Sequence, residues 1–490
     1  MAALARETAR GALLTIGSGI GARAVGLVST LVLARFLAPS AYGEVTVAAV
    51  LVMTASQLST LGFGQFLIAN PGAPRSTAFH VTVFHLVSGL VTLAVLLALG
   101  GVLGNAFDAP GMTRFLPGLT LAAALDRIGY VPERVLVREL RFGVLSLART
   151  VADLGYSVAS ITLAALGGGA AAIVVGNLVR SAVRATFFVG KVERRDWLEV
   201  SPLTRHETRA LLAFGVPMAV GASAAFAARR WDNLLVSHYF GPGPTGAYNL
   251  AYNLADVPAI QVGEQIGDVL LPSFARLEPS RRAAALVRSM ALLGLVVFPL
   301  AVGLGAVAPT LVSVLFDERW RSIGPMLVLL SALSVTRPVG WTVASYLQAS
   351  GRPVQILWLE VFKLVCLLGG IATLGRASPL FACGAVGLAF ALHALASLWV
   401  IQRVEGVSLG RSVACLMPPL AACVPLVGAV LAARFVLEHA GGVPPVLALV
   451  FEIAAGAVGY VVGAWLMARR ASEDLLARLL EAVRSRREAT

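Results

Sequence analysis

The sequence predicts an all-α polytopic membrane protein with about fourteen transmembrane helices, in two parallel six-helix lobes followed by two further C-terminal helices. Three observations support this fold class. The 490-residue chain is 58% hydrophobic and only 13% charged, whereas soluble domains are about one-quarter charged. Apolar runs recur that can cross the roughly 30 Å hydrocarbon core, which takes about 20 helical residues. A turn motif also recurs at the same place in two successive sets of six runs.

The apolar runs follow one another with mostly short connections, as in a helical bundle. They cover residues 11–33, 43–68, 79–104, 114–132, 143–166, 169–190, 208–236, 246–270, 283–307, 323–348, 353–375, 379–402, 411–434 and 444–468. The predicted organisation is an N-terminal lobe (1–190), a cytoplasmic linker (191–206), a C-terminal lobe (207–403), two further helices (404–470) and a cytoplasmic amphipathic basic tail (471–490).

Arginine and lysine set the predicted orientation, because basic loops are retained on the cytoplasmic side. With both termini in the cytoplasm, the inside loops receive most of the basic residues, including those of the linker 191–206 and of the tail. The net charge of +13 is thus explained by cytoplasmic loops and by a few arginines within the spans. Nucleic acid is therefore not an expected partner, and the lipid bilayer is.

The stretch from Ala210 to Phe274 predicts a hairpin of two membrane helices with a charged inner face. Its turn, Phe240–Gly246, resembles the earlier turn Leu37–Gly43, since both place a Pro and a Gly four residues apart after the first span of a set. Because six is an even number, the second set enters the membrane in the same orientation as the first. Parallel repeats of this kind are related by an axis along the membrane normal.

Several segments together resemble one protein family. They read RRWDNLLVSHYFGPGPTGAYNLAYNLADVP at 229–258, LLPSF at 270–274, LARFLAPSAYGEVTVA at 33–48, RVLVRELRFGVLSLA at 134–148, LFDERWRSIGPMLVLLSALS at 315–334 and LQASGRP at 347–353. Their order and spacing are similar to those of the Wzx-type oligosaccharide flippases of polysaccharide biosynthesis, members of the multidrug/oligosaccharidyl-lipid/polysaccharide (MOP) exporter superfamily with a MATE-like fold.

The resemblance implies a function at the bacterial inner membrane. The expected substrate is an undecaprenyl-pyrophosphate-linked oligosaccharide repeat unit, translocated by alternating access for exopolysaccharide, capsule or O-antigen synthesis. A polysaccharide polymerase and a chain-length regulator are candidate partners. The alternatives are a MATE-type cation-coupled drug exporter, a lipid II flippase and, from a different class, a membrane polysaccharide polymerase or ligase.

Charged residues within apolar runs are candidate functional residues, because they are costly in the membrane unless they face protein or water. Arg23 lies near the middle of the first run and could bind pyrophosphate through two parallel hydrogen bonds, or pair with an acid. Arg229, Arg230 and Asp232 lie where the family lines its central cavity. The two arginines predict anion binding there, although Arg229 or Arg230 could pair with Asp232.

Other embedded charges allow two interpretations each. Asp256 and Glu264 could couple transport to H⁺ or Na⁺, since burial raises a carboxyl pKa, or balance nearby arginines. Asp126-Arg127 and Arg337 are expected to be interfacial anchors. Two charged pairs occur at matching positions of the two repeats, and each could neutralise itself within its helix or form an inter-lobe gate; they are Arg149 with Asp153, and Glu360 with Lys363.

No catalytic constellation is found in the sequence. It contains no paired-carboxylate motif, no nucleophile elbow and no phosphate-binding loop. The four cysteines lack metal-ligand spacing. The sequence therefore predicts neither an enzyme nor a metalloprotein, and apart from a coupling ion it predicts no cofactor.

Overall fold

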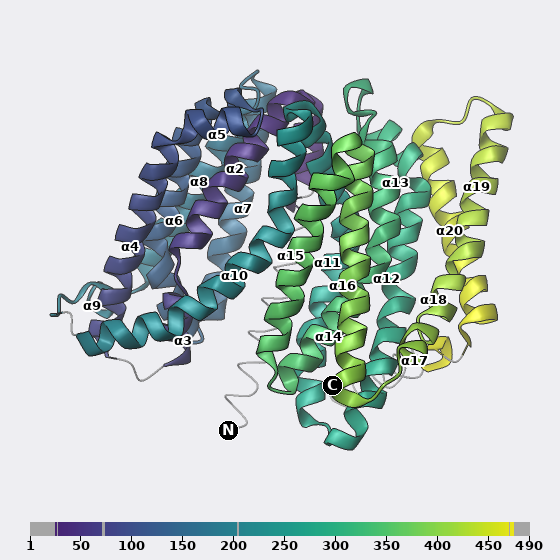
Figure 1. The fold of residues 1–490 in the computed structure, drawn as a ribbon. Coiled ribbons are helices and arrows are strands. Elements are labelled where there is room, and N and C mark those ends of the chain that lie inside the picture. The colour runs from purple at the N-terminus through teal and green to yellow at the C-terminus, as the bar shows by residue number, and fades with distance from the viewer. Residues whose placement is uncertain (1–24, 27, 71–73, 203–204, 470, 475–490) are drawn as a thin grey trace, which may run out of the picture. The chain divides into compact units, whose positions relative to one another are not determined.

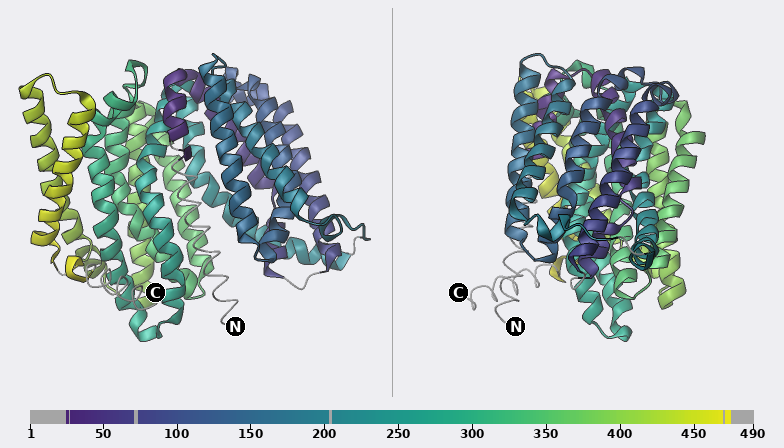
Figure 2. Two further views of the ribbon diagram at one scale, coloured as in Figure 1. Left: turned by 180° about the vertical axis from the view of Figure 1, so that it is seen from behind. Right: turned by 90° about the vertical axis from the view of Figure 1, so that its left-hand side faces the viewer.

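The computed structural model describes residues 25–26, 28–70, 74–202, 205–469 and 471–474, and these residues form α-helices and short 3₁₀-helices without a β-strand. The chain forms two compact units, Met1–Gly246 and Ala247–Thr490. Figures 1 and 2 show the helices of each unit as a bundle of long, roughly aligned rods. The all-helical fold class is confirmed.

The first unit is built around three long helices that pack along one another, α6, α7 and α8, with α2 packed against α4, α6 and α10. Its helices are α2 (Pro39–Ser59), α3 (Phe63–Ala69), α4 (Arg75–Ala98), α5 (Gly100–Ala106), η1 (Pro110–Arg114), α6 (Leu116–Arg138), α7 (Phe142–Ala165), α8 (Ala171–Lys191), α9 (Arg195–Leu198) and α10 (Arg205–Phe240). The core includes Phe63, Leu136 and Phe188, each 1% exposed or less.

The second unit packs α12 against α13 and α14, and α16 against α13, α14 and α15. Its helices are α11 (Pro242–Arg276, which starts in the first unit), α12 (Pro279–Leu315), η2 (Glu318–Trp320), α13 (Ile323–Leu333), η3 (Ser334–Thr336), α14 (Arg337–Ala349), α15 (Pro353–Thr373), η4 (Gly375–Ala377), α16 (Pro379–Glu405), α17 (Leu409–Ala414), α18 (Met417–Ala421), α19 (Cys423–Ala440) and α20 (Pro445–Met467). The α19 and α20 helices form a hairpin that packs on α12.

Ten helical segments in the described part of the chain are long and apolar enough to cross a membrane. Three others, α6, α7 and α11, are 23, 24 and 35 residues long but contain more polar and charged residues. Large apolar side chains on the unit surfaces are exposed, such as Val158, Val365 and Phe435 at 66%, 63% and 61%, as expected for side chains that face lipid. A polytopic membrane protein is thus confirmed, and the count of fourteen spans stays a prediction.

Some predicted spans are interrupted. The run 43–68 is divided between α2 and α3, because Leu61 and Gly62 adopt left-handed φ angles of 47° and 64° that end α2. The run 323–348 contains the 3₁₀ turn η3 between α13 and α14. The predicted linker 191–206 is short and partly helical, and the compact units divide at Gly246 rather than there. The boundaries of the two predicted lobes stay a prediction.

The two turns of the predicted repeat pack on each other. A Cβ atom on Gly43 would lie 1.8 Å from the carbonyl oxygen of Pro242, and a Cβ on Gly246 would lie 2.1 Å from that of Pro39. Each glycine therefore admits the proline carbonyl of the other turn. The resemblance between the two turns reflects a reciprocal contact that only a residue without a side chain can make on either side.

We expect Gly43→Ala to lower the free energy of unfolding by about 1–3 kcal/mol, the usual effect of forcing extra atoms into a packed contact. The new methyl group would overlap the Pro242 carbonyl. The loss of monodisperse protein after heating in detergent measures the effect. Gly243→Ala is the matched control, since a Cβ at Gly243 meets no atom within 4 Å. Equal melting of the two variants would contradict this explanation.

Candidate functional site

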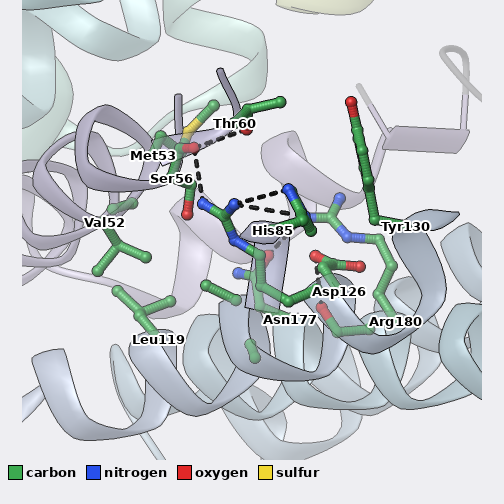
Figure 3. Close-up of a pocket in the computed structure, with 15 residues that line it drawn as sticks. Val52, Met53, Ser56, Thr60, His85, Leu119, Asp126, Tyr130, Asn177 and Arg180 are labelled. Atoms are coloured by element: carbon green, nitrogen blue, oxygen red, sulfur yellow. Dashed lines mark hydrogen bonds between the residues drawn. The ribbon is translucent and has the colours of Figure 1, made fainter. Parts of the chain in front are cut away.

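A cavity of about 320 Å³ opens inside the first unit between α2, α4, α6 and α8. Figure 3 shows polar side chains from several of these helices converging on it. Apolar residues such as Val52 and Leu119 form part of the wall. The polar and charged lining residues are Ser56, Thr60, His85, Asp126, Arg127, Tyr130, Asn177, Arg180 and Ser181.

Arg127 is the central cation of this cavity. It lies eleven residues from either end of α6, about 16 Å along the helix axis, and it is only 4% exposed. Its Nη2 donates to the Ser56 carbonyl at 2.6 Å and to Ser59 Oγ at 2.5 Å, and its Nη1 lies 3.3 Å from the ring nitrogens of His85. The expectation that Arg127 is an interfacial anchor is therefore wrong.

The end of α2 explains why Arg127 points here. The helix stops at Ser59, so the carbonyl of Ser56 is left for Thr60 Oγ1, at 2.8 Å, and for Arg127. The C-terminus of a helix carries a partial charge of about −0.5. The end of α2 thus supplies hydrogen-bond acceptors for a guanidinium, and it lies beside the middle of α6.

An ion-pair network extends from the cavity, which Asp126 and Arg180 line, into the packing of α6, α7 and α8. Its members are Asp126 and Glu133 of α6, Arg149 and Asp153 of α7, and Arg180 and Arg184 of α8. Glu133 is 4% exposed, and its carboxylate accepts from Arg149 Nη2 at 2.7 Å and lies 3.7 Å from Arg184. Arg184 is also 3.7 Å from Asp126, so it bridges the two acids of α6.

This network tests the predicted pairing of Arg149 with Asp153. Asp153 lies 4.0 Å from Arg180 of α8, and Arg149 pairs with Glu133 of α6, so the residues of α7 are neutralised by neighbouring helices. Side chains of α7 point to both sides, toward α6 and α8, because these helices pack on one another. Neutralisation within the helix is thus wrong for this pair. The predicted inter-lobe gate stays a prediction.

The charges around the cavity do not cancel. The unit 1 charged cluster consists of Arg127, Arg134, Arg149, Arg180 and Arg184 with Asp126, Glu133 and Asp153, so five cations accompany three carboxylates. The three ion-paired arginines balance the three acids, and the surplus is Arg127 and Arg134. Tyr130 lies between them in a chain of contacts: its ring receives the Arg134 guanidinium at 4.8 Å and stacks at 4.0 Å on His85, the imidazole beside Arg127.

Sequence reasoning did not single out Glu133, Arg180 or Arg184. A signal for them exists, since polar residues recur every three or four positions on α8, at Asn177, Arg180, Ser181 and Arg184. Such spacing places them on one helix face. On a span that is otherwise apolar, a polar stripe of this kind indicates a face turned toward protein or water.

The predicted cavity residues of α10 lie in different environments. Asp232 is 1% exposed, and its Oδ1 accepts from the backbone N–H of Asn233 at 2.9 Å and from its side-chain amide at 3.0 Å. Arg229 is exposed and Arg230 half-buried. The neighbouring Trp231 donates to Thr54 of α2 at 3.1 Å. Arg23, the other predicted pyrophosphate ligand, lies outside the described residues.

The second unit contains a charged cluster of its own, Asp256, Arg337, Glu360 and Lys363. Asp256 of α11 pairs with Arg337 at the start of α14, and Lys363 pairs with Glu360 one turn away on α15 at 2.6 Å. The pairing of Glu360 with Lys363 within their helix is therefore confirmed. Two cations meet two carboxylates, so this cluster is balanced.

Aromatic rings cover the cations of this second cluster. The Arg337 guanidinium lies 4.8 Å from the Phe390 ring and 5.4 Å from the Tyr252 ring, and its side chain is 10% exposed. Arg337 lies near the middle of the span Ile323–Ala349, so the expectation of an interfacial anchor is wrong here too. Asp256 balances the charge of Arg337, one of its two predicted roles. The side chain of Glu264 falls outside the described part.

Comparison with known proteins places the chain in a family. Residues 32–325 match the family model for polysaccharide biosynthesis proteins. The lipopolysaccharide biosynthesis protein WzxC of Escherichia coli is 26% identical over 74% of this chain and 73% of its own length. The succinoglycan biosynthesis transport protein ExoT of Rhizobium meliloti is 26% identical over 96% of this chain and 94% of its own.

Solved structures share the fold at low identity. The lipid II flippase MurJ, in an inward closed conformation, aligns with a TM-score of 0.73 at 12% identity, over 94% of this chain and 99% of that one. An inward-facing multidrug resistance MATE transporter of the MOP superfamily aligns with a TM-score of 0.62 at 16% identity, over 78% and 95%. The chain therefore belongs to the polysaccharide biosynthesis protein family, Wzx- and ExoT-like in sequence, and has the fold of MOP superfamily transporters.

Proposed function

We propose that this protein is a flippase that moves undecaprenyl-pyrophosphate-linked oligosaccharide repeat units across the bacterial inner membrane by alternating access, for exopolysaccharide, capsule or O-antigen synthesis. The family and the names of its relatives support a transport role in polysaccharide biosynthesis. The observation that favours an anionic substrate is the surplus of arginine in the unit 1 charged cluster, where Arg127 and Arg134 add to three ion-paired arginines.

The chemistry of the substrate fits such a site. Arginine binds phosphate groups through paired hydrogen bonds and keeps its charge in any environment. The glycan needs a polar route, whereas the polyprenyl chain is soluble in lipid. We infer that Arg23, Arg229 and Arg230, with Asp232 beside them, contact the pyrophosphate, and that the unit 1 charged cluster adds positive potential. No bond is made or broken in this reaction.

Two alternatives within the superfamily predict different sites. A MATE-type exporter of cationic drugs, coupled to H⁺ or Na⁺, would need an excess of acid, whereas the unit 1 charged cluster, with Arg127 and Arg134 included, has two more cations than carboxylates. A lipid II flippase would share the fold, and the likeness to MurJ is a likeness of fold alone. The identity of the lipid-linked glycan that accumulates without the protein separates these cases.

The decisive experiment is a gene deletion followed by analysis of lipid-linked glycans. We expect oligosaccharide repeat units on undecaprenyl pyrophosphate to accumulate on the cytoplasmic leaflet, with loss of the surface polymer. Re-expression of the protein should restore both. Accumulation of lipid II would instead support the peptidoglycan flippase, and unchanged lipid-linked pools with altered drug sensitivity would support the exporter.

We further propose fourteen transmembrane spans with both termini in the cytoplasm. Basic residues concentrate in alternate loops, as cytoplasmic loops do. In a variant without native cysteines, a membrane-impermeant thiol reagent should label a cysteine at position 243 in intact cells and not one at position 200. Val200 is 84% exposed, so its protection would reflect sidedness rather than burial. Labelling at position 200 would disprove this topology.

Arg23→Ala separates the two roles of that arginine. If Arg23 binds pyrophosphate, the variant should insert and fold normally while translocation is lost. Arg23→Lys should then keep part of the activity, since the charge remains but the two-pronged geometry is lost. If Arg23 instead pairs with an acid for structure, Arg23→Ala should lower protein level and melting temperature. A well-folded Arg23→Ala protein with full activity would exclude a role in holding the substrate.

A further inference from the structure

The cavity beside Arg127 has the size of a site for one sugar ring. Its volume of about 320 Å³ lies at the lower end of the range of small-molecule pockets, about 300–1,000 Å³. An oligosaccharide repeat unit, or a pyrophosphate with its flanking groups, would need more room. The cavity can therefore hold one residue of a glycan while the rest lies outside it.

The walls combine hydrogen-bonding groups with an apolar face. Asn177 and Ser181 of α8 line the cavity beside Asp126, to which Ser181 Oγ donates at 2.9 Å. Asn177 donates one amide hydrogen to the Ile173 carbonyl at 2.8 Å and accepts from Arg180, so its second amide hydrogen is the one that a ligand can take. Val52 and Leu119 line it as well. A pyranose ring presents hydroxyl groups around its edge and C–H groups on its faces. The lining thus offers each kind of surface that a sugar carries.

The charge of Arg127 is only partly compensated. Among the described residues, its hydrogen bonds within the protein go to neutral groups, the Ser56 carbonyl and the Ser59 hydroxyl, and its guanidinium also lies beside His85. The C-terminus of α2 supplies about half of a negative charge. The neighbouring Asp126 also attracts Arg127, but that carboxylate is shared with Arg184 at 3.7 Å. A guanidinium that is 4% exposed at the middle of a buried helix in a membrane protein is costly without a full counter-charge. A bound anion would complete the compensation.

The lining also sets the charge of that anion. Its charged members are Arg127, Arg180 and Asp126. Arg180 pairs with Asp153 and Asp126 pairs with Arg184, so the ion pairs of the described residues leave one net positive charge at the cavity, that of Arg127. A ligand with one carboxylate would neutralise this single positive charge. A pyrophosphate carries more negative charge and would lie against the Asp126 carboxylate. The cavity therefore favours a monoanion with hydroxyl groups over a phosphate group.

We propose that the Arg127 cavity is a subsite for one carboxylated sugar residue of the glycan, such as a uronic acid, with Arg127 binding its carboxylate and Asn177 its hydroxyl groups. This inference rests on the proposed function, since it assigns part of the substrate of the flippase. It makes Arg127 a specificity-determining residue for acidic repeat units, separate from the residues proposed for the pyrophosphate.

The test measures binding of D-glucuronate, D-glucose and inorganic pyrophosphate to the purified full-length protein in detergent, by ligand-observed NMR titration. We expect glucuronate to bind at least tenfold more tightly than glucose. Arg127→Gln should remove this preference. Asn177→Asp, which keeps the side-chain shape and adds a negative charge, should weaken glucuronate at least tenfold and change glucose little. Arg281→Gln, at a side chain 79% exposed, is the control and should behave as the parent.

The outcomes are separable. Equal affinity for glucuronate and glucose, an unchanged preference in both cavity variants, or no detectable binding of glucuronate would each overturn the proposal. Displacement of glucuronate by pyrophosphate, lost in Arg127→Gln, would identify a phosphate site and overturn it as well. If Arg127→Gln melts early because α2 loses its hydrogen bonds, Asn177→Asp decides. Complementation of a flippase-deficient strain by the parent protein tests the proposed function independently, so the subsite can fail while that function stands.

Discussion

Replacing Arg434 by Ala is expected to lower the free energy of unfolding by about 3–5 kcal/mol, the usual effect of breaking a buried ion pair. Its partner Glu452 of α20 is 1% exposed and accepts from Arg434 Nε at 3.0 Å and Nη2 at 2.9 Å, and from Thr310 of α12 at 2.7 Å. Arg434 also donates to the Ala306 carbonyl at 2.7 Å. Without the arginine, a carboxylate would remain buried between three helices.

The control for this prediction replaces both partners. Arg434→Met with Glu452→Leu removes the two charges together, and it should recover most of the lost stability, because apolar residues of similar size often replace a buried pair without penalty. Arg321→Ala, at a side chain 84% exposed, should change stability by less than about 0.5 kcal/mol. The melting temperatures of the purified variants in detergent rank their stabilities. An Arg434→Ala protein as stable as Arg321→Ala would show that Glu452 finds another partner or a proton.

Asp256→Asn is expected to lower the free energy of unfolding by a similar amount, about 3–5 kcal/mol. The substitution leaves the Arg337 guanidinium without its carboxylate, between the rings of Tyr252 and Phe390. Cation–π contacts contribute about 2 kcal/mol or more when they are desolvated, and they cannot replace a full counter-charge. We expect reduced protein level and earlier melting, with transport lost as a consequence.

A double variant separates charge balance from ion coupling. Asp256→Asn with Arg337→Gln removes both charges, so stability should return in either case. If Asp256 only balances Arg337, transport should return with stability. If Asp256 also takes up H⁺ or Na⁺ in the transport cycle, the stable double variant should remain inactive. Arg281→Gln, at an exposed side chain, serves as the control for arginine removal.

Several features of the site could be anticipated from the sequence because they follow from local patterns. The spacing of Glu360 and Lys363 places them one turn apart, and they form the expected ion pair. A carboxylate within a span allows two roles for Asp256, ion coupling and charge balance, and the structure supports charge balance with Arg337. The sequence shows the proline and the glycine of the two repeat turns, but it does not show that the two turns contact each other. In these cases the local sequence restricts the partner or the role of a residue to one or two possibilities.

Other features depended on which helices are neighbours. The sequence predicts Arg127 at the membrane interface because the apolar run ends near residue 132, whereas α6 extends to Arg138 and puts Arg127 at its middle. Its binding place also requires α2 to break at Leu61 and Gly62, far away in the chain. Likewise, Arg149 pairs with Glu133 across α6 and α7 rather than with Asp153 on its own helix. Helix spacing within one segment cannot reveal such choices.

By itself, the sequence determined the membrane class, the helical character of nearly every predicted span and the family, since hydrophobic length and ordered motifs are properties of contiguous residues. The tertiary structure alone decided where the charge resides: a balanced cluster in the second unit, and in the first a surplus that includes Arg127 beside a cavity. The physical reason is that electrostatic compensation acts across a few ångströms of space. Whether a buried arginine is neutralised depends on side chains from other helices, which the order of residues along one helix does not specify.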